Sequence, residues 1–383
     1  MKKICIITDT LKNDTILFPL MKRLREDDAV TLTVLSTGRH KTDDIALNFV
    51  SLKDGDLPAE ESLEISLIPG AAPGQASPDR EQHAYAAALK EIAPEILVLF
   101  GSSMATFSAA VAAFLNNIPV AHIQGGESDY GVWDDAYGFG ITKIANLHFT
   151  STETYRRRVI GFGEHPDRVF NVGSLAVQDL LARKIPDKET VCQSLDMNPA
   201  DEFIFVSMTP DRSIGSRNSA LMQSVSDALE NPKYNAFKLV CEDPGPRGFG
   251  RIMKRGLDRL SSRYPGRVCF LRDETLFPGV MAHCRAIVGN TDHCVVEGAT
   301  LRTPAVIVGD RLKDRENPGH MVPAGMDPAV VSTALDRALC PTFKLGLLFL
   351  TSPFEKEDTP GRIKEVLRAY TLCDTRAKTH FNR

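Results

Sequence analysis

The sequence predicts an α/β protein made of two doubly wound parallel sheets. Short strands alternate with helical segments along most of the chain, and the strands are apolar throughout, which is typical of parallel strands covered on both faces. The alternation restarts at about Phe203, and 383 residues exceed what one core usually holds. We therefore expect two Rossmann-like domains at residues 1–180 and 181–350, with the polar segment 183–201 as a linker. A C-terminal segment, 351–383, should pack back across both domains.

The first domain is expected to open on a buried strand and to alternate from there. Residues 54–78 are rich in Pro, Gly, Ala and Ser, which predicts a loop with one embedded strand. The other expected strands are Ile4–Thr8, Val30–Ser36, Ile96–Phe100, Pro119–Ile123, His148–Ser151 and Val169–Val172. The expected helices are Ile16–Arg25, Arg80–Ile92, Ala105–Asn116 and Ala136–Ile144.

The second domain repeats the same kind of alternation. Its expected strands are Phe203–Met208, Phe237–Cys241, Val268–Leu271, Ala286–Gly289 and Pro304–Val308. Its expected helices are Ser219–Leu229, Gly250–Arg263, Thr275–Cys284 and one from about Val295, followed by the terminal helix Lys356–Tyr370.

Composition and charge exclude several classes of protein. A formal net charge of −4 and a pI near 6.2 argue against nucleic acid or an anionic membrane as a partner. The longest apolar runs fall short of a membrane span. The N-terminal apolar run, Ile4–Ile7, is too short for a signal peptide. Eight scattered cysteines without a repeated spacing then indicate reduced thiols, and we predict a cytoplasmic protein.

The most informative stretch is residues 122–143, HIQGGESDYGVWDDAYGFGITK. Glu127 follows Gly125-Gly126 at the end of an apolar strand, where open α/β sheets bind ligands. The glycines allow a sharp turn and close approach of a ligand. Glu127 and one carboxylate of the pair Asp134-Asp135 could act as general acid and general base in one pocket. Glu127 could instead cap the following helix, and of Asp134 and Asp135 we expect one catalytic carboxylate and one helix cap.

Some neighbouring residues also have two interpretations. His122 lies on a strand, so it is either a hydrogen-bonded core histidine or a ligand contact. His283-Cys284 and His293-Cys294 match no common zinc spacing, and we expect no metal site there. The run 156–158, three arginines on a helix, is typical of a solvated face.

Several motifs occur in a characteristic order along both domains. They are Thr37-Gly38 with His40, IPVAHIQGGE at 118–127, Gly131, Asp134-Asp135, ITK at 141–143, HF at 148–149, YRRRVIGFGEHPDRVFNVGS at 155–174, Gly289-Asn290, Glu297 and GDRLKDR at 309–315. In this order they resemble the hydrolysing UDP-N-acetylglucosamine 2-epimerases. The resemblance implies a glycosyltransferase-B fold, in which the two domains face a central cleft and the second domain binds the nucleotide. It also implies a nucleotide-sugar substrate, a homodimer, and no cofactor or metal.

The family's reaction suits these residues. The nucleoside diphosphate is eliminated from a nucleotide-linked 2-acetamido sugar as the C2 proton is removed, and water then adds to give a free sugar inverted at C2. Such sugars feed surface-polysaccharide or nonulosonic (sialic-acid-like) acid synthesis. By resemblance Glu127 and Asp134, or its neighbour Asp135, are catalytic, and Glu297 binds the ribose at the start of a helix that faces the diphosphate. The other implied substrate contacts are His40, His122, Gly125, Gly126, Lys143, Asn290, Arg311 and Arg315.

Several positions depart from the family pattern. The catalytic aspartate expected after the third parallel strand is Ser102, and the family's Asn-Ser-Ser-Gly nucleotide turn reads Asn290-Thr291-Asp292-His293. Three more expected basic side chains are replaced by Leu11, Gly138 and Thr209. These departures favour a silent or repurposed relative that binds a nucleotide or sugar without turnover. A glycosyltransferase is a further alternative, because the implied fold is shared with such enzymes.

Overall fold

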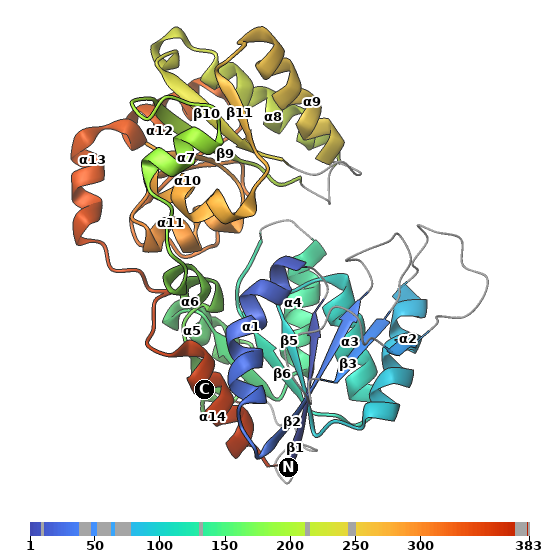
Figure 1. The fold of residues 1–383 in the computed structure, drawn as a ribbon. Coiled ribbons are helices and arrows are strands. Elements are labelled where there is room, and N and C mark those ends of the chain that lie inside the picture. Colours follow the sequence, from blue (N-terminus) through green and yellow to red (C-terminus); the bar gives the residue numbers. More distant parts are fainter. Residues whose placement is uncertain are drawn as a thin grey trace. The chain divides into compact units, whose positions relative to one another are not determined.

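The computed structural model describes residues 1–8, 11–37, 47–51, 63–65, 78–129, 133–210, 215–243, 250–371 and 381. The chain forms two compact units. Unit 1 comprises Met1–Glu127, Asp134–Asp179 and Lys356–Arg383, and unit 2 comprises Ser128–Trp133 and Leu180–Glu355. Each unit has its own sheet with helices on both faces, so the prediction of two doubly wound α/β units is confirmed (Figure 1).

The described part of unit 1 contains a sheet of eight strands in the order β4-β3-β2-β1-β5-β6-β7-β8. Neighbours from β2 to β8 are parallel, whereas β3 and β4 are antiparallel. The strands are β1 (Lys2–Thr8), β2 (Val30–Thr37), β3 (Leu47–Ser51), β4 (Leu63–Ile65), β5 (Ile96–Phe100), β6 (Val120–Ile123), β7 (Leu147–Thr150) and β8 (Val169–Asn171). The strand order reverses between β1 and β5, and such a switch point is where open α/β sheets bind ligands.

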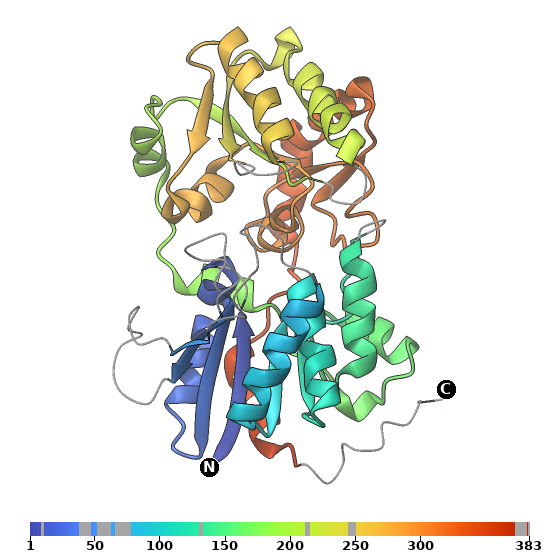
Figure 2. The ribbon, with the colours of Figure 1, turned by 90° about the vertical axis from the view of Figure 1, so that its right-hand side faces the viewer.

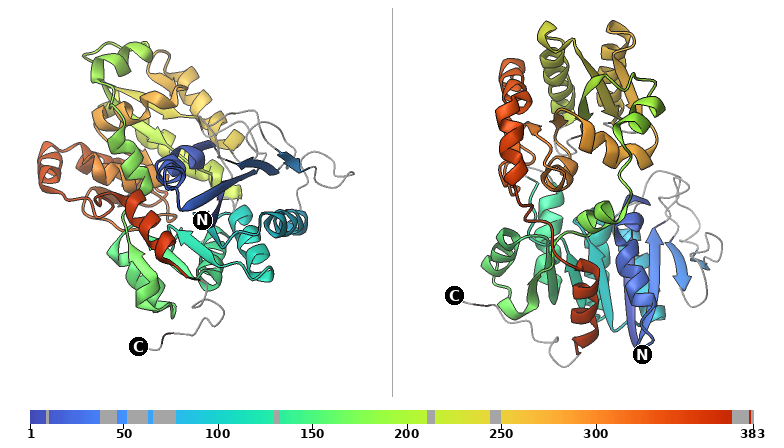
Figure 3. Two further views of the ribbon diagram at one scale, coloured as in Figure 1. Left: turned by 60° about the horizontal axis from the view of Figure 1, so that its bottom comes forward. Right: turned by 60° about the vertical axis from the view of Figure 1, so that its left-hand side comes forward.

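Helices bury both faces of this sheet. On one face α1 and α14 lie side by side, with Leu17, Leu20 and Ile363 fully buried (Figures 1 and 3). On the other face α2, α3 and α4 pack against β1 and β5 (Figure 2). The helices are α1 (Leu11–Arg25), α2 (Pro78–Ile92), α3 (Met104–Leu115), α4 (Trp133–Ile144), α5 (Glu153–Gly161), α6 (Leu175–Ala182) and α14 (Thr359–Ala369).

Among its described residues, unit 2 has a six-stranded parallel sheet in the order β11-β10-β9-β12-β13-β14, which reverses between β9 and β12. One face is covered by α8, α9 and α12, and the other carries α10, whose Phe277 ring meets Phe205. The strands are β9 (Glu202–Ser207), β10 (Phe237–Glu242), β11 (Val268–Leu271), β12 (Ile287–Gly289), β13 (Ala305–Val308) and β14 (Met321–Ala324). The helices are α7 (Lys188–Ser194), α8 (Gly215–Leu229), α9 (Gly250–Arg263), α10 (Phe277–His283), α11 (Val296–Thr300), α12 (Pro328–Leu339) and α13 (Pro341–Gly346).

Several elements differ from the sequence-based expectation. The strands β3 and β14 and the helices α6, α7, α12 and α13 were not predicted. Pro323 obscures β14, although a proline is tolerated there because β14 lies at the sheet edge. The polar segment expected as a linker contains α7, which buries Val191 and Cys192 and packs against α10. This segment is therefore part of the fold of unit 2.

No helix in the described ranges is long and apolar enough to cross a membrane. The seven cysteines within those ranges are free thiols, and most of them are buried.

Candidate active site

The Gly-Gly-Glu motif forms a tight turn directly after β6. Gln124 and Gly126 have φ angles of 70° and 82°, so the chain enters the left-handed region twice. The Gln124 backbone N–H donates to the Phe149 carbonyl at 2.9 Å. A Cβ at position 126 would lie 2.6 Å from the Tyr155 carbonyl oxygen, so glycine is required there. The turn brings Glu127 to the carboxyl edge of the sheet, just after β6, which is the strand next to β5.

Two side chains from the β7–α5 region hold the turn in place. Arg158 donates from Nη1 to the Gly126 carbonyl at 2.7 Å, and Ser151 donates from Oγ to Glu127 Oε1 at 2.6 Å. Of the three arginines expected on a solvated face, Arg157 fits, since its side chain is 74% exposed. Arg158 does not fit, because it is a structural support for the turn.

His122 is a neutral core histidine. Its side chain is buried, and Nε2 donates to the Gly101 carbonyl at 3.0 Å. Burial lowers the pKa of His122 to about 3; the bond to Gly101 acts in the opposite direction and His148 in the same direction. Nδ1 has no hydrogen-bond partner among the described groups, and the Cβ of a residue larger than Gly125 would lie 3.2 Å from it. His122 thus links the Gly-Gly turn to the end of β5.

The departures Ser102 and Gly138 meet each other in the fold. A Cβ at position 138 would lie 3.1 Å from the Ser102 Cβ, so α4 approaches the end of β5 closely at this point. A family-like arginine at 138 would require the helix or residue 102 to shift. Positions 102 and 138 are therefore adjacent in space.

Asp134 and Asp135 are the second and third residues of α4, which begins at Trp133. The expected helix began at Ala136, so neither aspartate is at the N-cap position, although both lie in a first turn that favours acids. Asp135 is partly buried, and the side chain of Asp134 lies outside the described part. His40 also falls outside the described residues.

Lys143, at the last turn of α4, is engaged by the protein itself. Its Nζ lies 2.8 Å from Glu164 Oε1 and donates to the Phe162 carbonyl at 3.0 Å. Glu164 is 3% exposed, and its other oxygen lies 3.2 Å from Nε2 of His148. These contacts attach α4 to the segment after α5.

In unit 2, the candidate residues gather where β9 and β12 end. A Cβ at Gly289 would lie 1.8 Å from the Ser207 carbonyl oxygen, so glycine allows the two strand ends to approach. The Asn290 side chain bridges to the backbone of Thr209 in both directions, accepting at 2.8 Å and donating at 3.0 Å. Asn290 and Thr209 therefore stabilise this edge directly.

Arg311 and Arg315, which follow β13, are paired with two aspartates. Arg311 donates to Asp129 at 2.7 Å and Arg315 to Asp292 at 2.6 Å, while Arg311 also lies 3.5 Å from Asp292. Burial lowers the pKa of Arg311, but attraction to Asp292 and Asp129 outweighs it, so the pKa is raised overall. The cluster holds two positive and two negative charges and is neutral.

Glu297 is in a short helix, α11, and contacts a histidine one turn earlier. His293 Nδ1 lies 2.8 Å from Glu297 Oε1, and both side chains are buried. His283, the other histidine that precedes a cysteine, contacts the Pro186 carbonyl through Nε2 at 3.0 Å. Within the described part, no three His, Cys, Asp or Glu side chains gather as metal ligands.

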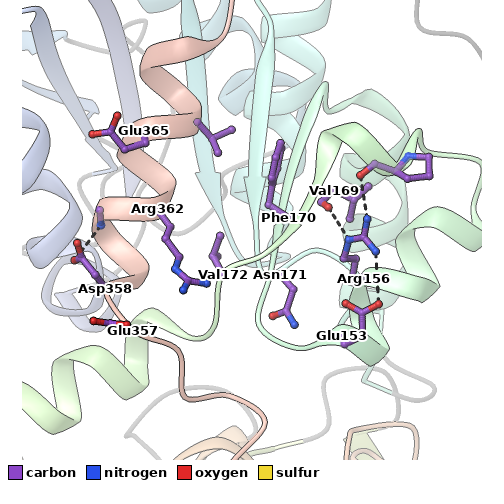
Figure 4. A pocket seen from close by; sticks show the side chains of 13 residues that line it. Glu153, Arg156, Val169, Phe170, Asn171, Val172, Glu357, Asp358, Arg362 and Glu365 are labelled. Atoms are coloured by element: carbon purple, nitrogen blue, oxygen red, sulfur yellow. Dashed lines mark hydrogen bonds and ion pairs between the residues drawn. The ribbon is translucent and has the colours of Figure 1, made fainter.

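A cavity of about 810 Å³ in unit 1 does not include these residues (Figure 4). It lies between α5, β8 and α14, with Arg156 and Glu153 on one side and Arg362 and Glu365 on the other. None of the described candidate residues lines it, so we do not assign it to the active site.

Comparison with known proteins decides the family. Residues 22–368 match the model of the UDP-N-acetylglucosamine 2-epimerase family. The chain belongs to this family. It is 24% identical, over 82% of each chain, to a GDP/UDP-N,N'-diacetylbacillosamine 2-epimerase (hydrolyzing) of Campylobacter jejuni. It is 25% identical to the polysialic acid biosynthesis protein P7 of Escherichia coli, over 94% of this chain and 91% of that one.

Solved structures of 2-epimerases share the fold of this chain. The UDP-GlcNAc 2-epimerase of Neisseria meningitidis, bound to UDP-GlcNAc, superposes with a TM-score of 0.76 at 17% identity, over 95% of this chain and 99% of that one. The predicted glycosyltransferase-B class and the predicted family are thus both confirmed. The protein is a 2-epimerase-family enzyme, and the roles of its individual residues stay predictions.

Sequence reasoning missed Ser151, Arg158 and Asp129. Ser151 and Arg158 lie in or beside motifs that resemble the family, but a lone serine and one arginine of three carry no visible signal. Asp129 sits only two residues after Glu127, yet its partner Arg311 is 182 residues away. Only the folded chain shows these pairings.

Proposed function

We propose that this 2-epimerase-family protein is a hydrolysing enzyme that acts on a nucleotide-activated 2-acetamido sugar similar to UDP-N-acetylglucosamine. It releases the nucleoside diphosphate and a free sugar inverted at C2, similar to N-acetylmannosamine. In the first step a carboxylate takes the C2 proton as the C1–O bond breaks, which leaves a glycal and the diphosphate. In the second step water adds to C1 and a proton returns to C2 from the opposite face.

In this proposal Glu127 and one of Asp134 and Asp135 carry the proton transfers. The observation that carries the proposal is the rigid Gly-Gly-Glu turn, which fixes a half-buried carboxylate at the carboxyl edge of the sheet. Ser102 lacks an ionisable group at neutral pH, so the two retained carboxylates must serve both steps. The diphosphate is assigned to unit 2, near Asn290, Glu297 and the two arginines.

The names of the relatives indicate which sugars and nucleotides the substrate can contain. The Campylobacter jejuni relative and one of Legionella pneumophila, which is 22% identical, are both called hydrolyzing epimerases of N,N'-diacetylbacillosamine nucleotides. We therefore include a 2,4-diacetamido sugar beside N-acetylglucosamine as the sugar, and UDP or GDP as the nucleotide. The product would enter surface-polysaccharide or nonulosonic acid synthesis.

A silent or repurposed relative is the second candidate function. The neutral cluster of Arg311, Arg315, Asp129 and Asp292 favours it, because the arginines that would receive a diphosphate already have carboxylate partners. Ser102 and Gly138 favour it as well, since they remove charged groups next to each other.

One experiment separates these functions. The protein is incubated in heavy water with UDP-N-acetylglucosamine and with UDP- and GDP-N,N'-diacetylbacillosamine, and the released nucleotide and sugar are measured. We expect nucleoside diphosphate and free sugar with deuterium at C2. Product without deuterium at C2 rules out elimination, and no turnover of any substrate favours the silent relative. Glu127→Gln serves as the control for contaminating activity.

Two further features of the proposal concern the cell and the assembly. Free cysteines suit a reducing compartment, and we keep the cytoplasm as the proposed location. The homodimer, which rests on the family resemblance, is tested by light scattering after size exclusion; a monomer at micromolar concentration would contradict it.

A further inference from the structure

We propose that Ser151 is a positioning residue that holds the carboxylate of Glu127 in the orientation needed for catalysis. The inference rests on the proposed function, because that function gives Glu127 a proton-transfer step. Ser151 follows the end of β7, while Glu127 follows the Gly-Gly turn after the neighbouring strand β6. Both residues therefore lie at the same edge of one sheet.

The contact is short and shielded from water. The Ser151 Oγ donates to Glu127 Oε1 at 2.6 Å, and Ser151 is 1% exposed. This distance lies in the range typical of a hydroxyl that donates to an ionised carboxylate, and such bonds are roughly twice as strong as neutral ones. A buried hydroxyl also has no water to bond in place of the carboxylate.

The hydroxyl of Ser151 is not needed for the helix that follows. Thr152 is the N-cap of α5, and its side chain accepts from the Tyr155 backbone N–H at 3.3 Å. In the described part of the chain, the side chain of Ser151 makes no hydrogen bond other than the one to Glu127. Helix capping, the usual structural reason for a serine at such a place, therefore does not account for this hydroxyl.

The backbone on both sides of the contact is fixed independently of it. The Val172 N–H donates to the Thr150 carbonyl at 3.0 Å, which anchors the end of β7, and Arg158 anchors the Gly126 carbonyl at 2.7 Å. Loss of the hydroxyl should thus leave the turn in place and remove one contact that orients the Glu127 side chain. A glutamate has several accessible rotamers, and a base that leaves its productive geometry slows proton transfer.

The test begins with Ser151→Ala. We expect kcat to fall by about tenfold while KM changes by less than about twofold, because positioning of the base matters in the transition state. Ser151→Thr keeps the hydroxyl and should recover most of the lost rate. In the Glu127→Ala background, Ser151→Ala should change kcat by less than about twofold, since it would act only through the missing carboxylate. Multiplicative losses in the double variant would overturn the proposal.

Ser174→Ala is the matched control. Ser174 follows β8, the next strand of the same sheet, and is also 1% exposed. Its Oγ has no hydrogen-bond partner among the described residues. We expect wild-type kcat for this variant. A loss equal to that of Ser151→Ala would mean that any change at a buried serine near this edge disturbs the enzyme, and would count against a specific role.

A crystal structure of Ser151→Ala tests the inference without turnover. We expect an unchanged backbone from residue 124 to 127 and a Glu127 side chain that is rotated or spread over several rotamers. An unmoved, well-ordered Glu127 carboxylate would contradict the positioning role. If the wild-type protein turns over no nucleotide sugar, the proposed function fails, whereas this structural comparison still decides whether Ser151 orients Glu127.

Discussion

The carboxyl edges of the two sheets differ in how they hold their candidate residues. In unit 1, Glu127 receives a hydrogen bond from the neutral hydroxyl of Ser151, and Arg158 binds the adjacent Gly126 carbonyl. In unit 2, Arg311 and Arg315 are bound by the carboxylates Asp129 and Asp292. At the unit 1 edge, a turn and a hydrogen bond orient the Glu127 carboxylate. At the unit 2 edge, carboxylates neutralise the charges of Arg311 and Arg315.

Under the proposed function, this difference would separate the proton transfers from the binding of the leaving group. The Glu127 carboxylate, oriented by the Ser151 hydroxyl, would act as an acid or base in the reaction of the sugar. A diphosphate that approached the arginines would have to compete with the carboxylates that already contact them, which would weaken its binding. We therefore expect substitutions at the unit 1 edge to change kcat and those at the unit 2 edge to change affinity.

The largest effect is expected from Glu127→Gln. Removal of a positioned acid or base costs about 10²- to 10⁴-fold in rate, and the amide keeps the size of the side chain. We expect this loss in kcat with an unchanged affinity for UDP, measured by turnover and by calorimetry. Full activity in the folded variant would mean that another residue carries out the proton transfers. The proposed difference between the two sheet edges would then be wrong.

Asp134→Asn and Asp135→Asn should show which aspartate is catalytic and which stabilises the first turn of α4. One variant should lose about 10²- to 10⁴-fold in kcat, as expected for a catalytic group. The other should lose less than about 1 kcal/mol of stability, as expected for an acid in the first turn of a helix. Turnover and thermal melting of both variants measure this. Equal, small effects in both would leave Glu127 as the sole candidate carboxylate.

Acid should destabilise both units through one buried histidine in each. Burial lowers the pKa of His122 to about 3 and that of His320 to about 4, from the ordinary histidine value of 6.5. The unfolded chain binds the proton first, so stability is full above pH 6.5 and falls as the pH drops toward these values. Between pH 7 and pH 5, each histidine should lower the free energy of unfolding by about 2 kcal/mol.

Denaturant unfolding of His122→Asn and His320→Asn at pH 7 and pH 5 measures these contributions. Each variant should lose about 2 kcal/mol of the pH dependence relative to the wild type. An unchanged pH dependence in both variants would mean that other groups cause the acid sensitivity.

The smallest effect is expected from Asp292→Asn. This carboxylate is 51% exposed and pairs with Arg315 at 2.6 Å, so its removal should strengthen UDP binding by roughly fivefold, or about 1 kcal/mol. Asp336→Asn is a matched control, since Asp336 is 52% exposed and pairs with Lys233 at 2.6 Å. Calorimetry with UDP compares the two. Weaker binding in Asp292→Asn would show that the carboxylate helps to hold the nucleotide.

Most of the regular elements could be predicted, because they follow from local pattern. The apolar runs and helical spacing placed β5, α9 and β11 with the bounds that the structure shows. Two of the exceptions, β14 and α7, have local causes as well. A proline within β14 conceals an edge strand, and the polar surface of α7 conceals a helix whose buried side chains are few.

The sequence by itself determined the two doubly wound units, the Gly-Gly-Glu turn and the family. These depend on hydrophobic periodicity and on residue types at short spacing, both of which can be read along the chain. Tertiary structure decided which side chains meet: Ser151 with Glu127, Arg158 with Gly126, and Arg311 with Asp129. For Ser151 and Glu127 the reason is that the neighbouring parallel strands β6 and β7 bring their carboxyl ends together, whatever their separation in sequence. A polar residue at one strand end thus has no local sign of the partner that it meets at the next.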